Sequence, residues 1–168
     1  MRTRQRDRDV PGPSAPWNEI VPGLWMGGHW WLGPEGIEPA VVRSEFDTVV
    51  SLVDIPGHGP DPQVAHHCGP VPDGPLSPGQ IDTVIRLAGR TAEALRSGRT
   101  VLVRCHSGYN RSGLVTARAL VDLGHGTEEA VELIRRRRSP WALHNRLFVD
   151  YLGTGLETAL LLTGLGPD

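Results

Sequence analysis

The chain has no lysine, and all 17 of its lysine-plus-arginine positions are arginines. Schiff-base enzymes and P-loop nucleotide hydrolases both need a lysine in the site, so the sequence excludes these two classes. The formal net charge is only −2. A chain without an overall basic field is not expected to bind nucleic acid.

Cysteine is scarce as well, with only Cys68 and Cys105. Two cysteines in 168 residues do not make a disulfide framework, and this favours a reducing compartment. The longest apolar stretch near the C-terminus, residues 159–162, is far too short to cross a bilayer. The arginine-containing start of the chain is not followed by the apolar segment of a signal peptide. We therefore expect a soluble, cytoplasmic protein without membrane contacts.

The length suits a single domain. Residues 1–16 alternate arginine with aspartate and then run into proline, glycine and serine, which predicts a disordered N-terminal tail. Residues 17–168 are expected to form the folded domain.

Strand and helix patterns alternate along this domain. A proline–glycine turn joins two short strands, and a run of β-branched residues is typical of a strand buried on both faces. Ser77 and Gln80 form a capping box at the start of a long helix. Thr127 is expected to cap a later helix, and Ser139-Pro140 to start another with Leu143, Leu147 and Leu152 inward. The pattern predicts an α/β fold with a largely parallel central sheet flanked by helices. Strands are expected at about 20–28 (a pair), 47–53, 64–71 and 100–103, and helices at 77–97, 112–123, 127–138, from 139, and 155–162.

The segment from Cys105 to Arg111 lies between a short apolar strand and a helix. A loop in this position can turn its backbone N–H groups inward around an anion, and the helix N-terminus adds positive potential. Both effects also stabilise a thiolate at Cys105, which is the nucleophilic form. The planar guanidinium of Arg111 can bind two phosphate oxygens. The expected phosphate-binding residues are His106, Ser107, Gly108, Tyr109, Asn110 and Arg111.

Cys-x5-Arg-Ser between a strand and a helix resembles the signature of the protein tyrosine phosphatase superfamily. The small size and the cysteine in the C-terminal half resemble its dual-specificity branch, over roughly residues 17–152. The resemblance implies a catalytic domain that hydrolyses phosphotyrosine, with phosphoserine and phosphothreonine as further substrates, through a cysteinyl-phosphate. It implies no cofactor and no metal, and its partners are phosphorylated proteins or small phosphoesters.

The resemblance also assigns roles to residues outside the loop. Asp73 stands where the family has the general acid that protonates the leaving oxygen. Ser112 matches the serine that helps Cys105 leave as a thiolate, and Asn145 lies where the family has an amide that orients water. Asp54 and Asp61 are rivals of Asp73, but they precede the strand that should deliver the acid.

The sequence departs from the family pattern at Arg104, where a histidine usually precedes the cysteine. Arg104 can support the loop in its place or pair elsewhere. Cys68 can form a reversible disulfide that protects Cys105, or it is an ordinary buried cysteine. The adjacent His66 and His67 point to opposite faces of a strand and are not expected to share a metal. Residues 135–138 are interpreted as a solvated helix end.

Two other functions remain open. A rhodanese-like sulfurtransferase also sets a cysteine in an anion-binding loop, although persulfide transfer does not need a proton donor at Asp73. A catalytically weak phosphate-binding module is the second alternative, and Arg104 is the one feature in its favour.

Overall fold

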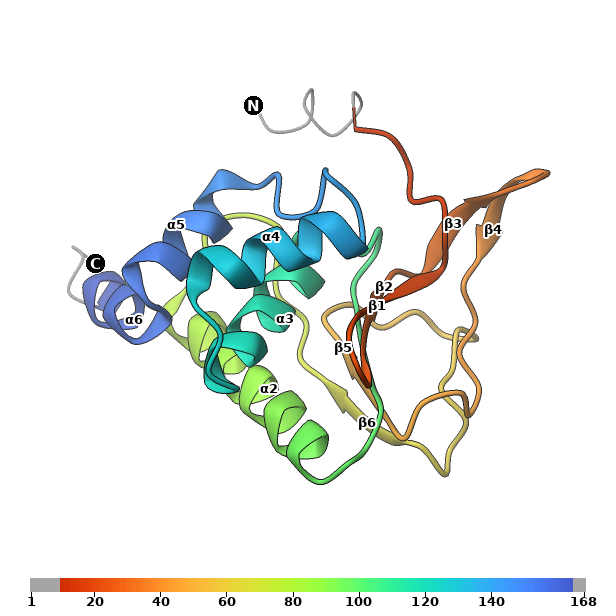
Figure 1. Ribbon diagram of the computed structural model, residues 1–168, viewed down its shortest axis with the longest axis horizontal. Helices are drawn as coiled ribbons and strands as arrows, with labels where there is room; N and C mark the ends of the chain where they lie inside the picture. Colours follow the sequence, from red (N-terminus) through yellow and green to blue (C-terminus); the bar gives the residue numbers. More distant parts are fainter. Residues whose placement is uncertain (1–9, 165–168) are drawn as a thin grey trace.

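A computed structural model describes residues 10–164. Strands and helices alternate through the middle of the chain, and helices alone form its C-terminal part (Figure 1). The strands are β1 (Trp17–Val21), β2 (Leu24–Gly27), β3 (Trp30–Gly33), β4 (Gly36–Pro39), β5 (Thr48–Ser51), β6 (Ala65–Cys68) and β7 (Val101–Arg104). The helices are α2 (Pro78–Arg96), α3 (Arg111–Asp122), α4 (Thr127–Arg137), α5 (Arg146–Thr154) and α6 (Leu156–Gly164).

The main sheet has the strand order β1-β2-β7-β5-β6. β1 and β2 are antiparallel, whereas β2, β7, β5 and β6 pair in parallel. The predicted α/β fold with a largely parallel sheet is therefore confirmed. Because β7 lies between two parallel neighbours, its residues are buried on both faces.

The helices gather on one side of the sheet (Figure 1). α2 and α3 pack on β7, and their buried side chains form the main core with the sheet. A smaller cluster of Val42, Phe46, Val49 and Leu102 lies on the opposite face. That face is covered by the segment between β4 and β5 rather than by a helix. β3 and β4 form a separate two-stranded hairpin, which the sequence analysis did not predict (Figure 1).

Helix starts are where prediction and structure differ most. The capping box at Ser77 is present, with its Oγ accepting from the Gln80 N–H and the Gln80 side chain accepting from the Ser77 N–H. The cap of α4 is Gly126 instead of Thr127. The helix predicted from Ser139 is wrong, because α5 begins at Arg146. The preceding segment turns sharply instead, and Leu143 is buried there with a positive φ of 57°.

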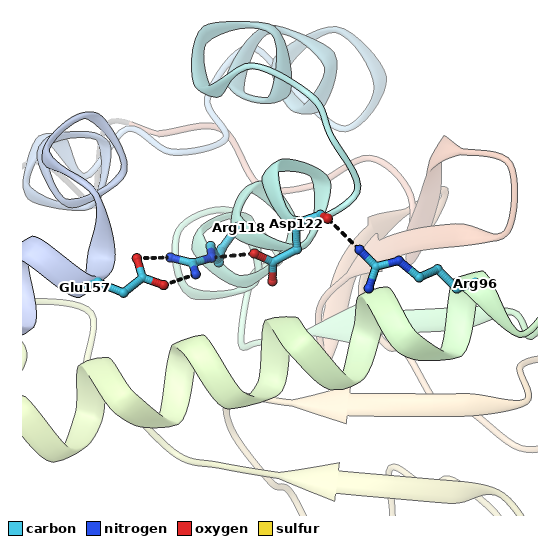
Figure 2. Close-up of polar contacts among 4 residues, drawn as sticks. All are labelled: Arg96, Arg118, Asp122 and Glu157. Atoms are coloured by element: carbon cyan, nitrogen blue, oxygen red, sulfur yellow. Dashed lines mark hydrogen bonds and ion pairs between the residues drawn. The ribbon is translucent and has the colours of Figure 1, made fainter.

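A network of ion pairs and hydrogen bonds joins α6 to the core (Figure 2). Arg118 of α3 donates to Asp122 over 2.9 Å and to both carboxylate oxygens of Glu157 in α6. Arg96 at the end of α2 donates to the Asp122 carbonyl over 2.6 Å. The network therefore joins α2, α3 and α6 on the side of the molecule that bears the C-terminal helices.

The N-terminal segment corrects the prediction of a disordered tail through residue 16. Residues 10–16 lie against the domain, because four of their carbonyl groups accept hydrogen bonds from distant parts of the chain. Pro11 accepts from the Tyr109 hydroxyl over 2.7 Å, and Ala15 from Arg138 over 2.8 Å. Pro13 and Pro16 accept from the backbone N–H groups of residues 32 and 28. Residues 1–9 of the predicted tail lie outside the described residues.

Candidate active site

The carboxyl end of β7 places Cys105 at one edge of the sheet. Parallel neighbours β2 and β5 end at the same edge, so the segments that follow all three strands meet there. The Cys105 N–H donates to the Gly27 carbonyl over 3.3 Å, and the side chain is only 3% exposed. The nucleophile predicted from the sequence thus lies at the carboxyl end of the central strand of the sheet.

The loop after Cys105 has its carbonyl groups turned outward. The His29 N–H donates to the His106 carbonyl over 2.8 Å, and the Leu143 N–H to the Tyr109 carbonyl over 3.0 Å. Arg138 donates to the Ser107 and Gly108 carbonyls, each over 3.1 Å. Because a trans peptide directs its C=O and N–H to opposite sides, the following N–H groups face inward. Inward-facing N–H groups are what anion binding by residues 106–111 needs, and that binding stays a prediction.

Two glycines permit the loop to pack this closely. Gly108 has a φ of +74°, and a Cβ there would lie 2.5 Å from the Gly27 backbone. A Cβ on Gly28 would lie 2.6 Å from the His106 carbonyl oxygen. The chain therefore needs glycine on both sides of this contact.

Ser112 lies directly behind the nucleophile. Its Oγ is 3.2 Å from the Cys105 Sγ, and the serine is completely buried in the first turn of α3. Its hydroxyl is within reach to donate to a thiolate.

Arg111 is the first residue of α3 and lines the cleft beside Cys105. Its Nη1 donates to the Val71 carbonyl over 3.3 Å. Val71 begins the segment that carries Asp73, so Arg111 joins the cysteine loop to the loop of the predicted acid.

Two asparagine side chains hold the carboxylate of Asp73. Asn110 Nδ2 donates to one oxygen over 3.0 Å, and Asn145 Nδ2 donates to the other over 2.8 Å. Asn145 is also the N-cap of α5, because its Oδ1 accepts from the Leu147 N–H. The predicted acid, loop and amide are therefore brought together. The predicted water-orienting role of Asn145 stays a prediction.

Cys105, Arg111 and Asp73 line one cleft of about 340 Å³. Trp30 of β3 forms part of its wall, and its Nε1 donates to His106 Nδ1 over 2.9 Å. Burial and the positive charge of Arg111 lower the pKa of His106. Residues 10–13 form another part of the wall, where the Pro11 carbonyl accepts from the Tyr109 hydroxyl.

Arg104 points away from the cysteine loop, because neighbouring strand residues project to opposite faces. It is fully buried, and its three guanidinium nitrogens donate to Ser51 Oγ and to the carbonyls of His58 and Gly59. Burial lowers its pKa. Arg104 therefore fixes the segment that follows β5.

A buried histidine, His29, lies behind the loop and contacts the partly buried His58. His29 Nε2 is 2.7 Å from the Val53 carbonyl oxygen, and its Nδ1 is 3.3 Å from Nδ1 of His58. Since a carbonyl can only accept, His29 Nε2 carries a proton and Nδ1 of the neutral ring accepts from His58. Burial lowers the pKa of His29 to about 4.

The structure does not bring Cys68 to Cys105. Ser51 of β5 pairs with Cys68 on one side and with Arg104 on the other. Two strand spacings of about 4.8 Å separate β6 from β7, which exceeds the Cα distance of about 7 Å that a disulfide tolerates. Cys68 is also exposed, so its interpretation as a buried cysteine is wrong.

His66 and His67 are neighbours in β6, and His66 Nε2 is 2.8 Å from Ser51 Oγ. Within residues 10–164, no three or more histidine, cysteine, aspartate or glutamate side chains are grouped to hold a metal. In the same range, no helix combines the length and apolar character needed to cross a membrane.

Two features of the site were not predicted. They are the wall of residues 10–13 and Arg138 beneath the loop. Arg138 belongs to the run interpreted as a solvated helix end, but it is buried, with only 9% of its surface exposed. Arg135 also turns inward and donates to the carbonyls of Ala142 and Leu143. Four consecutive arginines carry no local signal that separates the two inward-facing ones.

The fold matches solved phosphatase structures. Human DUSP28 superposes with a TM-score of 0.64 at 23% identity, covering 90% of this chain and 97% of that chain. Tk-PTP in its active form gives 0.60 at 23% identity, covering 84% and 97%. Kinase associated phosphatase, with its catalytic site cysteine replaced by serine, gives 0.61 at 12% identity, covering 95% and 100%.

No protein-family model matches the chain, and no curated protein matches its sequence. The structural matches extend over nearly the whole chain, so the similarity includes the whole domain and not the loop alone. Residues 10–164 therefore have the fold of the dual-specificity and tyrosine phosphatases.

Proposed function

We propose that this protein is a cysteine-dependent phosphatase that hydrolyses phosphomonoesters. The observation that carries the proposal is the convergence of Cys105, Arg111 and Asp73 on one cleft, with Ser112 Oγ behind the cysteine sulfur. An anion site, a nucleophile and a proton donor together are what phosphoryl transfer needs.

In the first half-reaction, the Cys105 thiolate attacks phosphorus and the bond to the leaving oxygen breaks. Asp73 transfers its proton to that oxygen, which departs as an alcohol or phenol. Arg111 and the loop N–H groups stabilise the charge on the three other phosphate oxygens. The product of this step is a cysteinyl-phosphate.

In the second half-reaction, a water molecule attacks the cysteinyl-phosphate. Asp73, now ionised, accepts a proton from the water, and the sulfur–phosphorus bond breaks. Ser112 donates a hydrogen bond to the departing thiolate. Asn145 holds the carboxylate of Asp73, and its further proposed role is to orient the attacking water.

Phosphotyrosine is the proposed substrate group, with phosphoserine and phosphothreonine as further ones, in phosphoproteins or small phosphoesters. Aromatic side chains of Trp30 and Tyr109 line the cleft and support an aryl substrate. No cofactor enters the proposed reaction, and the proposed location is the cytoplasm. The arrangement of Asp73 beside Cys105 gives no support to a sulfurtransferase, which needs no such donor.

The direct test is hydrolysis of p-nitrophenyl phosphate between about pH 5 and 8, with orthovanadate as inhibitor. We expect turnover by the wild type and none by Cys105→Ser. Retained turnover in Cys105→Ser would refute the mechanism. An inactive wild type that still binds phosphate would favour the binding module.

The role of Asp73 is tested by its dependence on the leaving group. Asp73→Asn is expected to slow hydrolysis of an alkyl phosphate by about 10²-fold or more, because alkoxide leaves poorly without a proton. The effect on p-nitrophenyl phosphate should be much smaller. Asp61→Asn is the matched control, since Asp61 lines a different pocket. Equal losses for both substrates would reject Asp73 as the acid.

A further inference from the structure

Arg138 reaches the site from behind, at the end of α4. Its guanidinium makes four hydrogen bonds: Nε to the Gly108 carbonyl, Nη2 to the Ser107 carbonyl, and Nη1 to the Ala15 carbonyl and to Asn18 Oδ1. The acceptors are three carbonyls and one amide oxygen, with no carboxylate among them. Within residues 10–164 this buried cation has no carboxylate partner, which is costly, so its position needs an explanation.

The two loop contacts determine the direction of two peptide groups. The Ser107 carbonyl belongs to the same peptide as the Gly108 N–H, and the Gly108 carbonyl to the same peptide as the Tyr109 N–H. Since each carbonyl is held outward by Arg138, both N–H groups are directed into the cleft. Glycine at 108 makes this segment the most free to rotate, so it has the greatest need of an external restraint.

The other loop carbonyls have backbone donors. His29, Leu143 and Leu114 hold the carbonyls of residues 106, 109 and 110 through their N–H groups. Among these contacts, only the Ser107 and Gly108 carbonyls are held by a side chain. A point mutation can therefore remove their restraint without altering the rest of the loop.

The positive charge of Arg138 also favours anion binding by the loop. Burial lowers its pKa to about 10, while the nearby Cys105 and Tyr109 raise it, so the guanidinium remains protonated at neutral pH. It is not among the residues that line the cleft. Its field nevertheless favours an oxyanion bound there.

We propose that Arg138 is the positioning residue of the anion site, holding the Ser107–Gly108 and Gly108–Tyr109 peptides with their N–H groups toward the substrate oxygens. This inference rests on the proposed function, because it assumes that the loop binds an oxyanion. Arg138 is not a catalytic residue, since it acts through the loop and not on the reacting atoms.

The test measures tungstate binding by calorimetry, in a Cys105→Ser background that removes chemistry. Arg138→Met removes the fork and the charge, and Arg138→Lys keeps a charge but cannot reach both carbonyls at once. We expect both variants to bind tungstate about tenfold or more weakly, because the Gly108 and Tyr109 N–H groups would no longer be directed at the charged anion. Arg137→Met, at the exposed neighbouring position, should bind like the parent.

Nuclear magnetic resonance of the Cys105→Ser parent supplies a measurement that does not depend on the folding of an Arg138 variant. The amide signals of Gly108 and Tyr109 and the Nε signal of Arg138 are expected to shift together as tungstate saturates the site. In Arg138→Met, the two amide signals should broaden or double while those of α2 stay unchanged, which a general loss of stability would not produce.

The outcomes separate this proposal from the proposed function. A parent that binds tungstate, with an Arg138→Met variant that binds it equally well, would overturn the role of Arg138 alone. That role would also be overturned if the three signals of the parent stayed in place while tungstate saturated the site. A parent that binds no tungstate would overturn the anion site and both proposals with it.

Discussion

Acidification should weaken the fold through His29, the buried histidine behind the cysteine loop. Its pKa falls from 6.5 to about 4 because burial disfavours the charged ring, and the neighbouring Arg104 adds repulsion. Between these values the unfolded chain binds the proton more tightly than the folded one. The stabilising effect of a neutral His29 is therefore complete above pH 6.5 and is lost as the pH falls toward about 4.

The magnitude follows from the two pKa values. The shift corresponds to about 3 kcal/mol over the whole range, and to about 2 kcal/mol between pH 7.5 and pH 5. For a domain of this size, a loss of about 2 kcal/mol is a large part of the total stability. It should lower the urea midpoint by about 1 M.

Urea unfolding at pH 7.5 and pH 5, followed by circular dichroism, measures the effect. The comparison variant is His29→Gln, whose Nε2 can still donate to the Val53 carbonyl but does not titrate. Other histidines are present in both proteins, so their contributions cancel in the difference. We expect the wild type to lose about 2 kcal/mol more than the variant. Identical losses would show that His29 is not the group responsible and would refute the reasoning.

Three further predictions concern the loop and the C-terminal helices. Gly108→Ala should abolish hydrolysis of p-nitrophenyl phosphate, because its Cβ would lie 2.5 Å from the Gly27 backbone; near-normal activity would contradict the tight packing. Ser112→Ala should slow breakdown of the cysteinyl-phosphate more than its formation, which a burst of p-nitrophenol in stopped-flow measurements would reveal and a simple linear trace would contradict. Glu157→Gln should reduce the free energy of unfolding by less than about 1 kcal/mol, because this carboxylate is 61% exposed; a larger loss in urea titration would mean that the network in Figure 2 is a main support of α6.

The sequence predicted the strand, loop and helix around Cys105 because the signals for this arrangement are local. A strand, a cysteine, a glycine and a helix-opening arginine follow one another within a few residues, and their arrangement depends little on the rest of the chain. The position of Asp73 came from the family resemblance, and the structure places that side chain beside Asn110 and Asn145. The catalytic roles of these residues stay predictions.

The features that were not predicted have a common physical origin, since each depends on partners far away in the chain. Residues 10–16 have the composition of a disordered segment, and their order comes from donors such as Tyr109 and Arg138. The burial of Arg138 depends on helix phase and on acceptors near the N-terminus. Local propensity also did not predict that Leu143 would have a positive φ instead of a helical conformation.

The contacts of Arg138 have a consequence for the order in which the protein folds. They join segments 123 and 120 residues apart, and the Tyr109 contact with Pro11 spans 98 residues. Contacts of such long range close large loops and tend to form late. The helices and the central sheet should therefore form before the N-terminal segment docks. After dilution from denaturant, far-UV circular dichroism should recover first and tungstate binding afterwards, so that the protein passes through a folded state whose anion site is not yet assembled.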